Sequence, residues 1–174
     1  MRKVLLIFSQ LTDGDVEWLS KAGDRIHMDK GATMIPNGAR VDNLYFVLDG
    51  RLAIRSATGE LIRMLESGEV IGEMSLVDPA PTVVSVEIDA DATLLRIPNL
   101  RMREKLGSDT AFAARFYRAL CVFLADRMRT TTSRMGYGTV VQDPNAKDEL
   151  HDDLLDAVHL AGARFDRMLK RLAG

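Results

Sequence analysis

The chain has 174 residues, a formal net charge of −2 and a pI near 5.9, so it shows no basic excess that would favour DNA, RNA or an anionic membrane. Its single cysteine, Cys121, excludes a disulfide framework, a four-cysteine zinc site and a cysteine-ligated iron–sulfur cluster within one chain. No apolar run approaches the roughly 20 residues that span a membrane, and the short apolar run 4–8 has no small-residue cleavage site after it. We therefore expect a cytoplasmic protein with a packed N-terminal segment.

A short helix is predicted over residues 12–22. Thr12 is a favourable N-cap residue, and Asp13, Asp15 and Glu17 place negative charge near the positive end of the helix dipole. Gly23 follows the last helical residue as a stop signal.

Between positions 24 and 98, short runs of β-branched and apolar residues alternate with glycine, Asp and Asn. Strands are predicted over 25–28, 33–35, 44–48, 51–57, 61–65, 83–88 and 93–97. The pairs Asp49-Gly50 and Thr58-Gly59 are typical of hairpin turns. Short, regularly spaced strands with such turns predict a β-sandwich, roll or barrel.

Two helices are predicted after Pro98: a short one over 100–106, capped by Asn99, and a long one over 109–134, capped by Ser108 or Asp109. One side of the long helix carries large apolar residues, namely Phe112, Phe116, Leu120, Phe123 and Leu124. Another side carries Ala113, Tyr117, Cys121 and Met128. A helix that is apolar on so much of its circumference buries two faces, so we expect it to cover the β-domain and to pair with a second copy as a homodimer.

The glycines and the proline of residues 135–146 predict a linker, and residues 147–174 follow as a C-terminal amphipathic helix. Its apolar residues recur at a spacing close to a heptad, with acids at its start and bases at its end. Three docking surfaces remain open for this helix: its own domain, its dimer mate, or a separate protein partner.

The segment 68–86 combines a Gly-Glu pair, a short apolar turn, a proline-rich loop and a β-branched strand. Gly72 allows the backbone to approach a ligand closely. The backbone N–H groups of Glu73, Met74 and Ser75 are placed to bind a phosphate, and the Glu73 carboxylate is suited to accept hydrogen bonds from sugar hydroxyls. The pattern predicts an anion-binding cradle.

Three motifs together resemble the cyclic nucleotide-binding domain of the catabolite-activator-like family. They are Leu-Tyr-Phe-Val-Leu-Asp-Gly at 44–50, Leu-Glu-Ser-Gly-Glu-Val-Ile-Gly-Glu at 65–73, and Ala-Thr-Leu-Leu-Arg-Ile-Pro at 92–98 followed by two helices. The resemblance covers about residues 11–134. It implies an α+β fold, a double-stranded β-helix or jelly-roll-like β-roll of about eight strands, within a domain over 1–134 that includes the long dimerisation helix.

In that family, the residues at the positions of Gly72 and Glu73 bind the ribose 2′-OH, and backbone amides around Met74 and Ser75 hold the cyclic phosphate. An arginine late in the family's phosphate-binding cassette, which corresponds here to the segment 68–86, neutralises the phosphate. A small residue follows that arginine on the base side. Thr82 stands here at the arginine position, and Val83 follows it. A hydrogen bond to a charged group contributes roughly 1.5–3 kcal/mol, so the loss lowers the affinity for a cyclic monophosphate by one to several orders of magnitude.

The resemblance also places Phe123 and Arg127 where family members close over the base, although helix pairing explains these two residues equally well. Whether Arg63 or an arginine of the long helix supplies the missing positive charge is left open by the sequence.

No catalytic motif is present, and the three scattered histidines do not have the spacing of a metal site, so we expect neither an enzyme nor a metal centre. Too few residues follow position 134 for a helix-turn-helix domain, which usually needs about 50, so no DNA binding is expected. Three hypotheses remain. The first is a receptor for cAMP or cGMP with a degenerate cassette, the second is a receptor for another anionic or less charged ligand, and the third is a ligand-free dimerisation or docking module.

Overall fold

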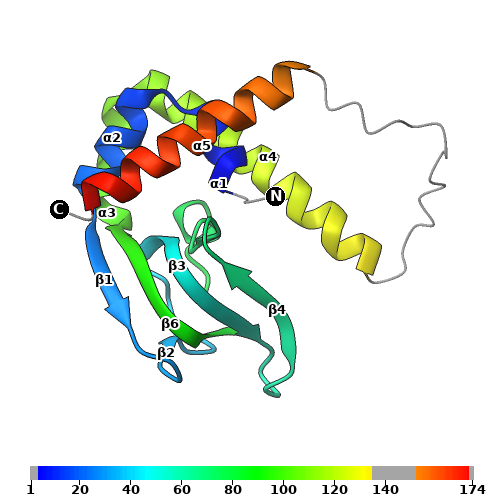
Figure 1. Cartoon of the computed structure of the whole chain (residues 1–174). Coiled ribbons are helices and arrows are strands. Elements are labelled where there is room, and N and C mark those ends of the chain that lie inside the picture. The colour runs from blue at the N-terminus through cyan, green and yellow to red at the C-terminus, as the bar shows by residue number, and fades with distance from the viewer. Residues whose placement is uncertain (1–3, 135–151, 173–174) are drawn as a thin grey trace, which may run out of the picture.

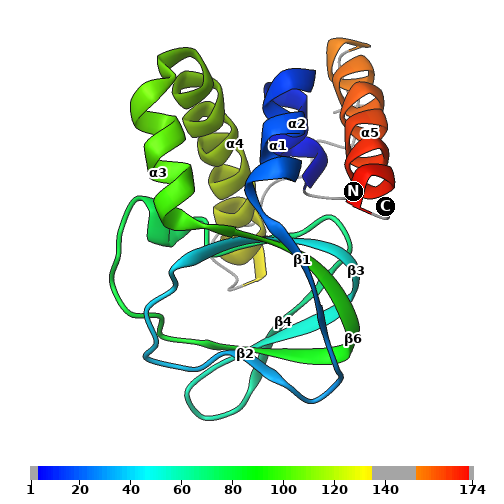
Figure 2. The ribbon, with the colours of Figure 1, turned by 90° about the vertical axis from the view of Figure 1, so that its left-hand side faces the viewer.

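The computed structural model describes residues 4–134 and 152–172. The strands form a roll at one end of the molecule, and the helices form a layer over it (Figure 1). Turned by 90°, the layer shows α3 and α4 at one side, α1 and α2 in the middle and α5 at the other side (Figure 2). The bounds of the helices are α1 Val4–Gln10, α2 Asp13–Ala22, α3 Asn99–Ser108, α4 Thr110–Arg134 and α5 Asp152–Leu172.

Helix α2 begins as the sequence predicts. The Thr12 side chain accepts a hydrogen bond from the backbone of Asp15, and the Asp15 carboxylate accepts one from the backbone of Thr12, which completes a capping box. Helix α1 was expected only as a packed segment; it is helical, with Ile7 and Phe8 fully buried.

One antiparallel sheet forms the roll in the described chain, with the order β1-β6-β3-β4, and with β2 paired to β6 and β5 paired to β3. The two longest strands pair along almost their whole length, from Asn43 opposite Pro98 to Arg55 opposite Ser85. The strand bounds are β1 Asp24–Met28, β2 Thr33–Ile35, β3 Asn43–Arg55, β4 Leu61–Glu66, β5 Val70–Ile71 and β6 Ser85–Pro98.

The expectation of about eight strands is wrong, because two pairs of predicted runs are continuous strands. The predicted hairpin at Asp49-Gly50 is absent, and β3 passes through both residues with shifts of register against β6. Gly50 has a φ of +94°, so it bends the strand as a bulge instead of reversing it. The turn at Thr58-Gly59 is confirmed, since it joins the antiparallel strands β3 and β4.

Strand β3 separates two parts of the core, because successive side chains on a strand point to opposite faces. Phe46 and Leu48 join the helix-side core, which includes residues of all five helices. Val47 points the other way into the roll interior, beside Leu94 and Ile71. The residues nominated for ligand binding line a cavity at the edge of this second core.

Helix α4 is capped by Asp109, whose side chain accepts a hydrogen bond from the backbone of Phe112 at 2.8 Å. Its predicted apolar stripe is confirmed as core, with Phe112, Phe116 and Phe123 fully buried. The other predicted face is open to solvent, since Tyr117, Cys121 and Met128 are exposed.

Helix α5 packs on α1 and α2 of its own chain, which resolves one question that the sequence left open. Ala161, Phe165 and Met168 are buried, and the Phe165 ring lies 6.1 Å from the ring of Phe8, centroid to centroid. The apolar face of α5 therefore closes the helix-side core. Residues 135–151, which include the predicted linker, lie outside the described residues.

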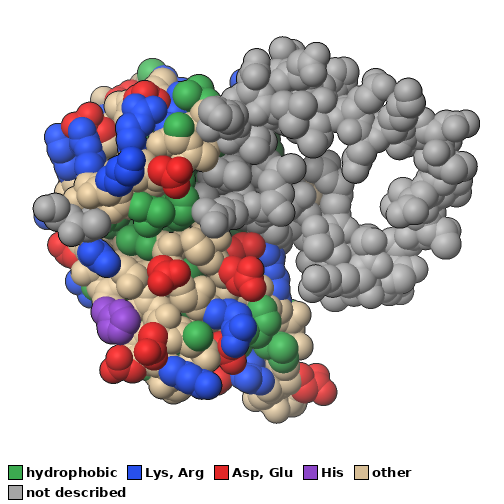
Figure 3. Space-filling model, viewed as in Figure 1, with side chains coloured by type: hydrophobic (Ala, Val, Ile, Leu, Met, Phe, Trp, Pro, Cys, Tyr) green, Lys and Arg blue, Asp and Glu red, His purple; other side chains and the backbone are tan. Residues whose placement is uncertain are grey.

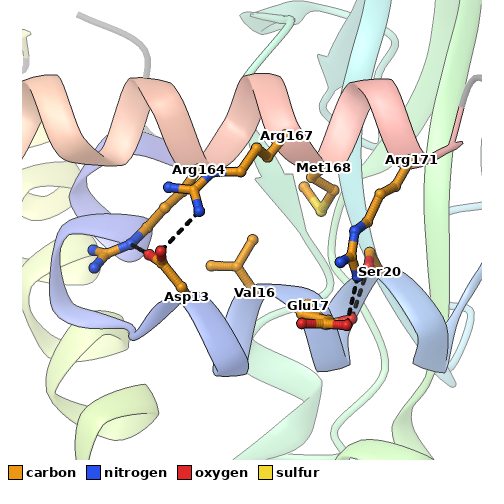
Figure 4. Close-up of a pocket in the computed structure, with 8 residues that line it drawn as sticks. All are labelled: Asp13, Val16, Glu17, Ser20, Arg164, Arg167, Met168 and Arg171. Atoms are coloured by element: carbon orange, nitrogen blue, oxygen red, sulfur yellow. Dashed lines mark hydrogen bonds and ion pairs between the residues drawn. The ribbon is translucent and has the colours of Figure 1, made fainter.

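Arginines on α5 form ion pairs with Asp13 and Glu17 on α2 across this interface, and we refer to this set of ion pairs as the clasp (Figure 4). Arg164 and Arg167 both pair with Asp13, at 2.7 and 2.8 Å, and Arg171 pairs with Glu17 at 2.8 Å. Lys and Arg side chains gather over the helical layer, at the end where α2 and α5 lie (Figure 3).

Basic side chains of α5, and Lys21 of α2 itself, lower the pKa of these two carboxyl groups. Hydrogen bonds from Arg164 and Arg167 hold the pKa of Asp13 below its ordinary value, and those from Lys21 and Arg171 lower the pKa of Glu17 to about 2. A carboxyl group with a lowered pKa in the docked state stabilises that state fully above its ordinary pKa. The contribution is lost as the pH falls toward the lowered value.

We therefore expect α5 to loosen as the pH falls from 4.5, the ordinary pKa of Glu17, toward about 2, the lowered pKa of that group. Amide hydrogen exchange followed by NMR is expected to show α5 losing protection over this range before the strands do. The variant Asp13→Asn, which removes one partner, is expected to lose part of that protection already at neutral pH. Protection of α5 that stays constant down to pH ~2, relative to the strands, would contradict a clasp that depends on ionised carboxylates.

Gly50 and Gly59 offer a matched pair for testing the bulge in β3. Both have positive φ, but a Cβ at Gly50 would collide with the backbone of Asp91 and Ala92, whereas a Cβ at Gly59 meets open space. Gly59→Ala is expected to cost about 1 kcal/mol in urea unfolding, the strain of the left-handed backbone alone. Gly50→Ala is expected to cost more than about 3 kcal/mol because the strands must move apart. Equal costs for the two variants would show that the close approach at Gly50 does not exist.

Candidate functional site

A cavity of about 330 Å³ opens between the cassette and the interior of the roll. It is lined by all six residues that the sequence nominated for ligand binding: Gly72, Glu73, Met74, Ser75, Thr82 and Val83. The remaining lining residues are Ile35, Val41, Ile54, Ile71, Asp78, Ala80, Pro81, Val84 and Val86. The segment after β5 and the start of β6 thus meet around one hollow.

Gly72 makes the turn from β5 into the cassette. Its φ is +84°, and a Cβ at this position would collide with the backbone carbonyl of Asn43. Glycine is therefore required here by the close approach of β3, whether or not a ligand binds. The turn delivers Glu73 and the short 3-10 helix η1, Met74–Leu76, to the cavity wall.

Ser75 fastens this short helix to the rest of the domain. Its hydroxyl donates a hydrogen bond to the carbonyl of Gly72 at 2.6 Å and accepts one from the side-chain amide of Asn99 at 2.9 Å. The carbonyl of Ser75 also accepts a hydrogen bond from Arg103 at 3.2 Å. Two residues of α3 therefore hold the cassette directly.

Asn99 does not have the role that the sequence predicted. It is the first residue of α3, and its side-chain amide donates to the carbonyl of Val41 and to the hydroxyl of Ser75 instead of capping the helix. Its side-chain oxygen is buried and has no hydrogen-bond partner among the described residues. The link between the loop before β3, the cassette and α3 was missed because it joins positions far apart in the chain.

Thr82 is the residue that the resemblance places at the position of the family arginine, and its polar groups bond to nearby loop residues. Its hydroxyl donates to the carbonyl of Val84 at 3.1 Å and lies 3.2 Å from the backbone N–H of the same residue. Its backbone N–H and carbonyl bond to Ala39 and Gly38. Thr82 thus serves the loop geometry and brings no positive charge.

The charges at the cavity are acidic. Of the fifteen lining residues, only Glu73 and Asp78 are charged, and the Glu73 side chain is buried. Arg63, one of the residues considered as a substitute cation, lies outside the lining and pairs with Glu69 at 2.8 Å. The structure therefore supplies no lysine, arginine or histidine to the described cavity wall.

Of the two residues nominated to close over the base, one lies in the helix-side core, and the side chain of the other is outside the described part of the chain. Phe123 is fully buried in the helix-side core and does not line the cavity. Arg127 lies on α4, and its side chain is outside the described part of the chain. Met74 and Val83, by contrast, are exposed at the rim of the cavity.

Sequence reasoning also missed the floor of the cavity. Ile35, Ile54, Ile71 and Val86 come from four different strands and all belong to the roll core. Nothing in the spacing of these residues indicates that they meet, because the contacts depend on how the roll closes. Among the described residues, no three His, Cys, Asp or Glu side chains are grouped as a metal site, and no helix is long and apolar enough to cross a membrane.

Comparison with known proteins agrees with this geometry. Residues 25–109 match the model of the cyclic nucleotide-binding domain. No curated protein matches the chain. Many solved structures do match, among them the N-terminal domain of a transcriptional regulator from Streptomyces coelicolor A3(2), at 26% identity and a TM-score of 0.61, covering 74% of this chain and 91% of that chain.

Two further structures show the same fold at lower identity. A cyclic nucleotide-binding domain from Methylobacillus flagellatus KT has a TM-score of 0.69 at 18% identity, covering 76% of this chain and 80% of that chain. The Thermus thermophilus Catabolite Activator Protein has a TM-score of 0.62 at 21% identity, covering 97% of this chain and 86% of that chain. Residues 25–109, which include the cassette and nearly all of the roll, thus form a cyclic nucleotide-binding domain.

Proposed function

We propose that the chain is a non-enzymatic regulatory module of the cytoplasm that senses a small molecule in the cassette cavity and acts as a homodimer through α4. The observation that carries this proposal is the direct attachment of the cavity wall to α3. Ser75 lines the cavity and is hydrogen-bonded to Asn99, and only Asp109 separates α3 from α4. A ligand that shifts the short helix η1 thereby shifts the start of the helical layer.

A cyclic nucleotide such as cAMP or cGMP is the ligand class that the resemblance suggests. Gly72 and Glu73 stand at the cavity as the family pattern requires. The missing arginine costs the phosphate a charge-assisted hydrogen bond, so a cyclic monophosphate is expected to bind at least about tenfold more weakly than it would with that arginine present.

The exposed face of α4 supports the homodimer. Tyr117 is 43% exposed and Met128 is 70% exposed, and Cys121 lies between them along the helix. These side chains share the apolar face that the fold of one chain leaves uncovered. A second copy of the same helix would cover it through a two-fold symmetric contact, which is the commonest arrangement in homodimers.

A ligand-free docking module of the same fold is the second candidate. The hydroxyls of Ser75 and Thr82 are both bonded within the cassette, so the wall is held together without a ligand. In that case dimerisation through α4, and a protein partner at the exposed side of α5, would carry the function.

A ligand screen separates the two candidates. Thermal unfolding with cAMP, cGMP, cyclic dinucleotides and uncharged ring compounds is expected to show a saturable stabilisation by at least one class. Val86→Phe, which fills the cavity floor, is expected to abolish that shift, whereas Val77→Phe, at an exposed position outside the lining, is expected to keep it. No stabilisation at millimolar concentration, with the dimer retained, would favour the docking module.

The dimer is tested by placing a charge on the open face of α4. Tyr117→Glu is expected to shift the chain from dimer to monomer in analytical ultracentrifugation at micromolar concentration, because a carboxylate would have to be buried in the apolar interface. Leu100→Glu is the matched control, since Leu100 is also exposed but lies on α3. If both variants remain dimeric, or the unaltered chain is monomeric, α4 is not the interface.

A further inference from the structure

The floor of the cassette cavity is a continuous aliphatic surface. Ile35, Ile54, Ile71 and Val86 are each at most 8% exposed and belong to the core of the roll. Val41 and Val84 pack against the same core and extend the surface toward the rim. A ligand that enters the cavity therefore exchanges water for hydrocarbon over most of its contact area.

The side-chain hydroxyl groups of the cavity wall already form hydrogen bonds within the domain. Ser75 bonds to Gly72 and Asn99, Thr82 bonds to Val84, and the carboxylate of Asp78 accepts a hydrogen bond from the backbone of Ala80 at 3.1 Å. A charged ligand group that loses its water on entry needs strong compensating donors. The side-chain hydroxyls of the wall do not offer those donors without breaking their own hydrogen bonds.

The charged side chains near the cavity also disfavour an anionic ligand. Glu73 and Asp78 are the charged lining residues, so no side chain of the described wall brings a positive charge to a phosphate. Two arginines near the cassette are bonded to protein groups: Arg63 pairs with Glu69, and Arg103 of α3 donates to the carbonyl of Ser75. Any ligand group that contacts a carboxylate of this wall must donate a hydrogen bond, because an ionised carboxylate only accepts.

We propose that the cavity takes an uncharged, mainly apolar small molecule in place of a cyclic monophosphate. The inference rests on the proposed sensing function and names the ligand class of that same site. The volume of about 330 Å³ lies at the lower end of the range for small-molecule sites, roughly 300–1,000 Å³, so the ligand is small. Thr82 is the residue that determines the specificity, because it replaces a phosphate-neutralising cation with a neutral side chain whose hydroxyl is already bonded.

A neutral fluorescent probe, N-phenyl-1-naphthylamine, tests the proposal on the full chain. Its fluorescence is expected to rise and saturate at micromolar concentration, and 1 mM cAMP is expected to leave the bound fraction unchanged. Val86→Phe is expected to weaken the probe at least tenfold, and Val77→Phe is expected to bind it as the unaltered chain does. Where Val86→Phe fails to fold by circular dichroism, Val84→Phe replaces it at a half-buried lining position.

Two charge variants test the role of Thr82. Thr82→Arg restores a cation, and Thr82→Gln adds comparable length without charge. Calorimetry is expected to show cAMP binding at least tenfold more tightly to Thr82→Arg than to Thr82→Gln, and the neutral probe binding no more tightly to Thr82→Arg. Equal cAMP affinities in the two variants would overturn the assignment of ligand class to the missing charge.

The outcomes separate this inference from the proposed function. If the unaltered chain binds cAMP at micromolar concentration and adenosine fails to compete, the phosphate is recognised, so the ligand class is wrong and the sensing function stands. If the probe binds equally to the unaltered chain and to the folded cavity-filling variant, its site is not this cavity, and the inference fails. If neither the probe nor any cyclic nucleotide binds at millimolar concentration, both proposals fail.

Discussion

The hydroxyl of Ser75 occupies the junction on which the site and the helical layer both depend. It donates to the carbonyl of Gly72, across the first turn of the cassette, and accepts from Asn99, the first residue of α3. The turn at Gly72 is possible only because glycine leaves room for the backbone of Asn43. Strand β3, the cavity wall and the helix that leads into α4 are therefore joined within a few hydrogen bonds. In a buried setting such bonds are costly to leave unmade, so we expect a displacement of one part to be passed to the others.

Several arginines stabilise the helical layer, whereas none lines the described cavity. Arg115 of α4 grips Asp15 of α2 through two hydrogen bonds, at 2.7 and 2.9 Å. Burial raises the pKa of Asp15, but the hydrogen bonds from Arg115 and Thr12 outweigh it and hold the pKa below its ordinary value. The arginines of α5 are likewise committed to α2. The protein thus combines a helical layer that is held by ion pairs with a cavity wall whose charged side chains are acidic.

Local chemistry made part of this predictable. The N-cap of α2 at Thr12, the turn at Gly59 and the buried stripe of α4 are properties of neighbouring residues, so the sequence alone indicated them. The grouping of residues 72–75 and 82–83 could be predicted because the resemblance implies how the roll closes. In the structure these residues line one cavity. Strand fusion at Gly50 was missed because a glycine with positive φ produces a hairpin turn or a bulge, and the choice depends on pairing with β6.

Long-range contacts were beyond prediction. Asn99 reads as a helix cap from its neighbours, and only the folded roll shows that Val41 and Ser75 take its side chain. The aliphatic floor is assembled from four strands, and the docking of α5 on α1 depends on burying Phe165 beside Phe8. In each case the deciding partner is remote in sequence, so periodicity and local propensity carry no information about it.

A titration of the full chain with the neutral probe, followed by methyl and amide NMR, tests most directly whether the cavity is coupled to the helices through Ser75. The expected result is a shift of the methyl signals of Ile54 and Ile71 together with the amide of Asn99 and amides along α4. In Ser75→Ala the methyl shifts are expected to persist while those of α4 diminish. Shifts that stop at the cavity in the unaltered chain, or that spare the cavity methyls altogether, would contradict a ligand site that reports to the helical layer.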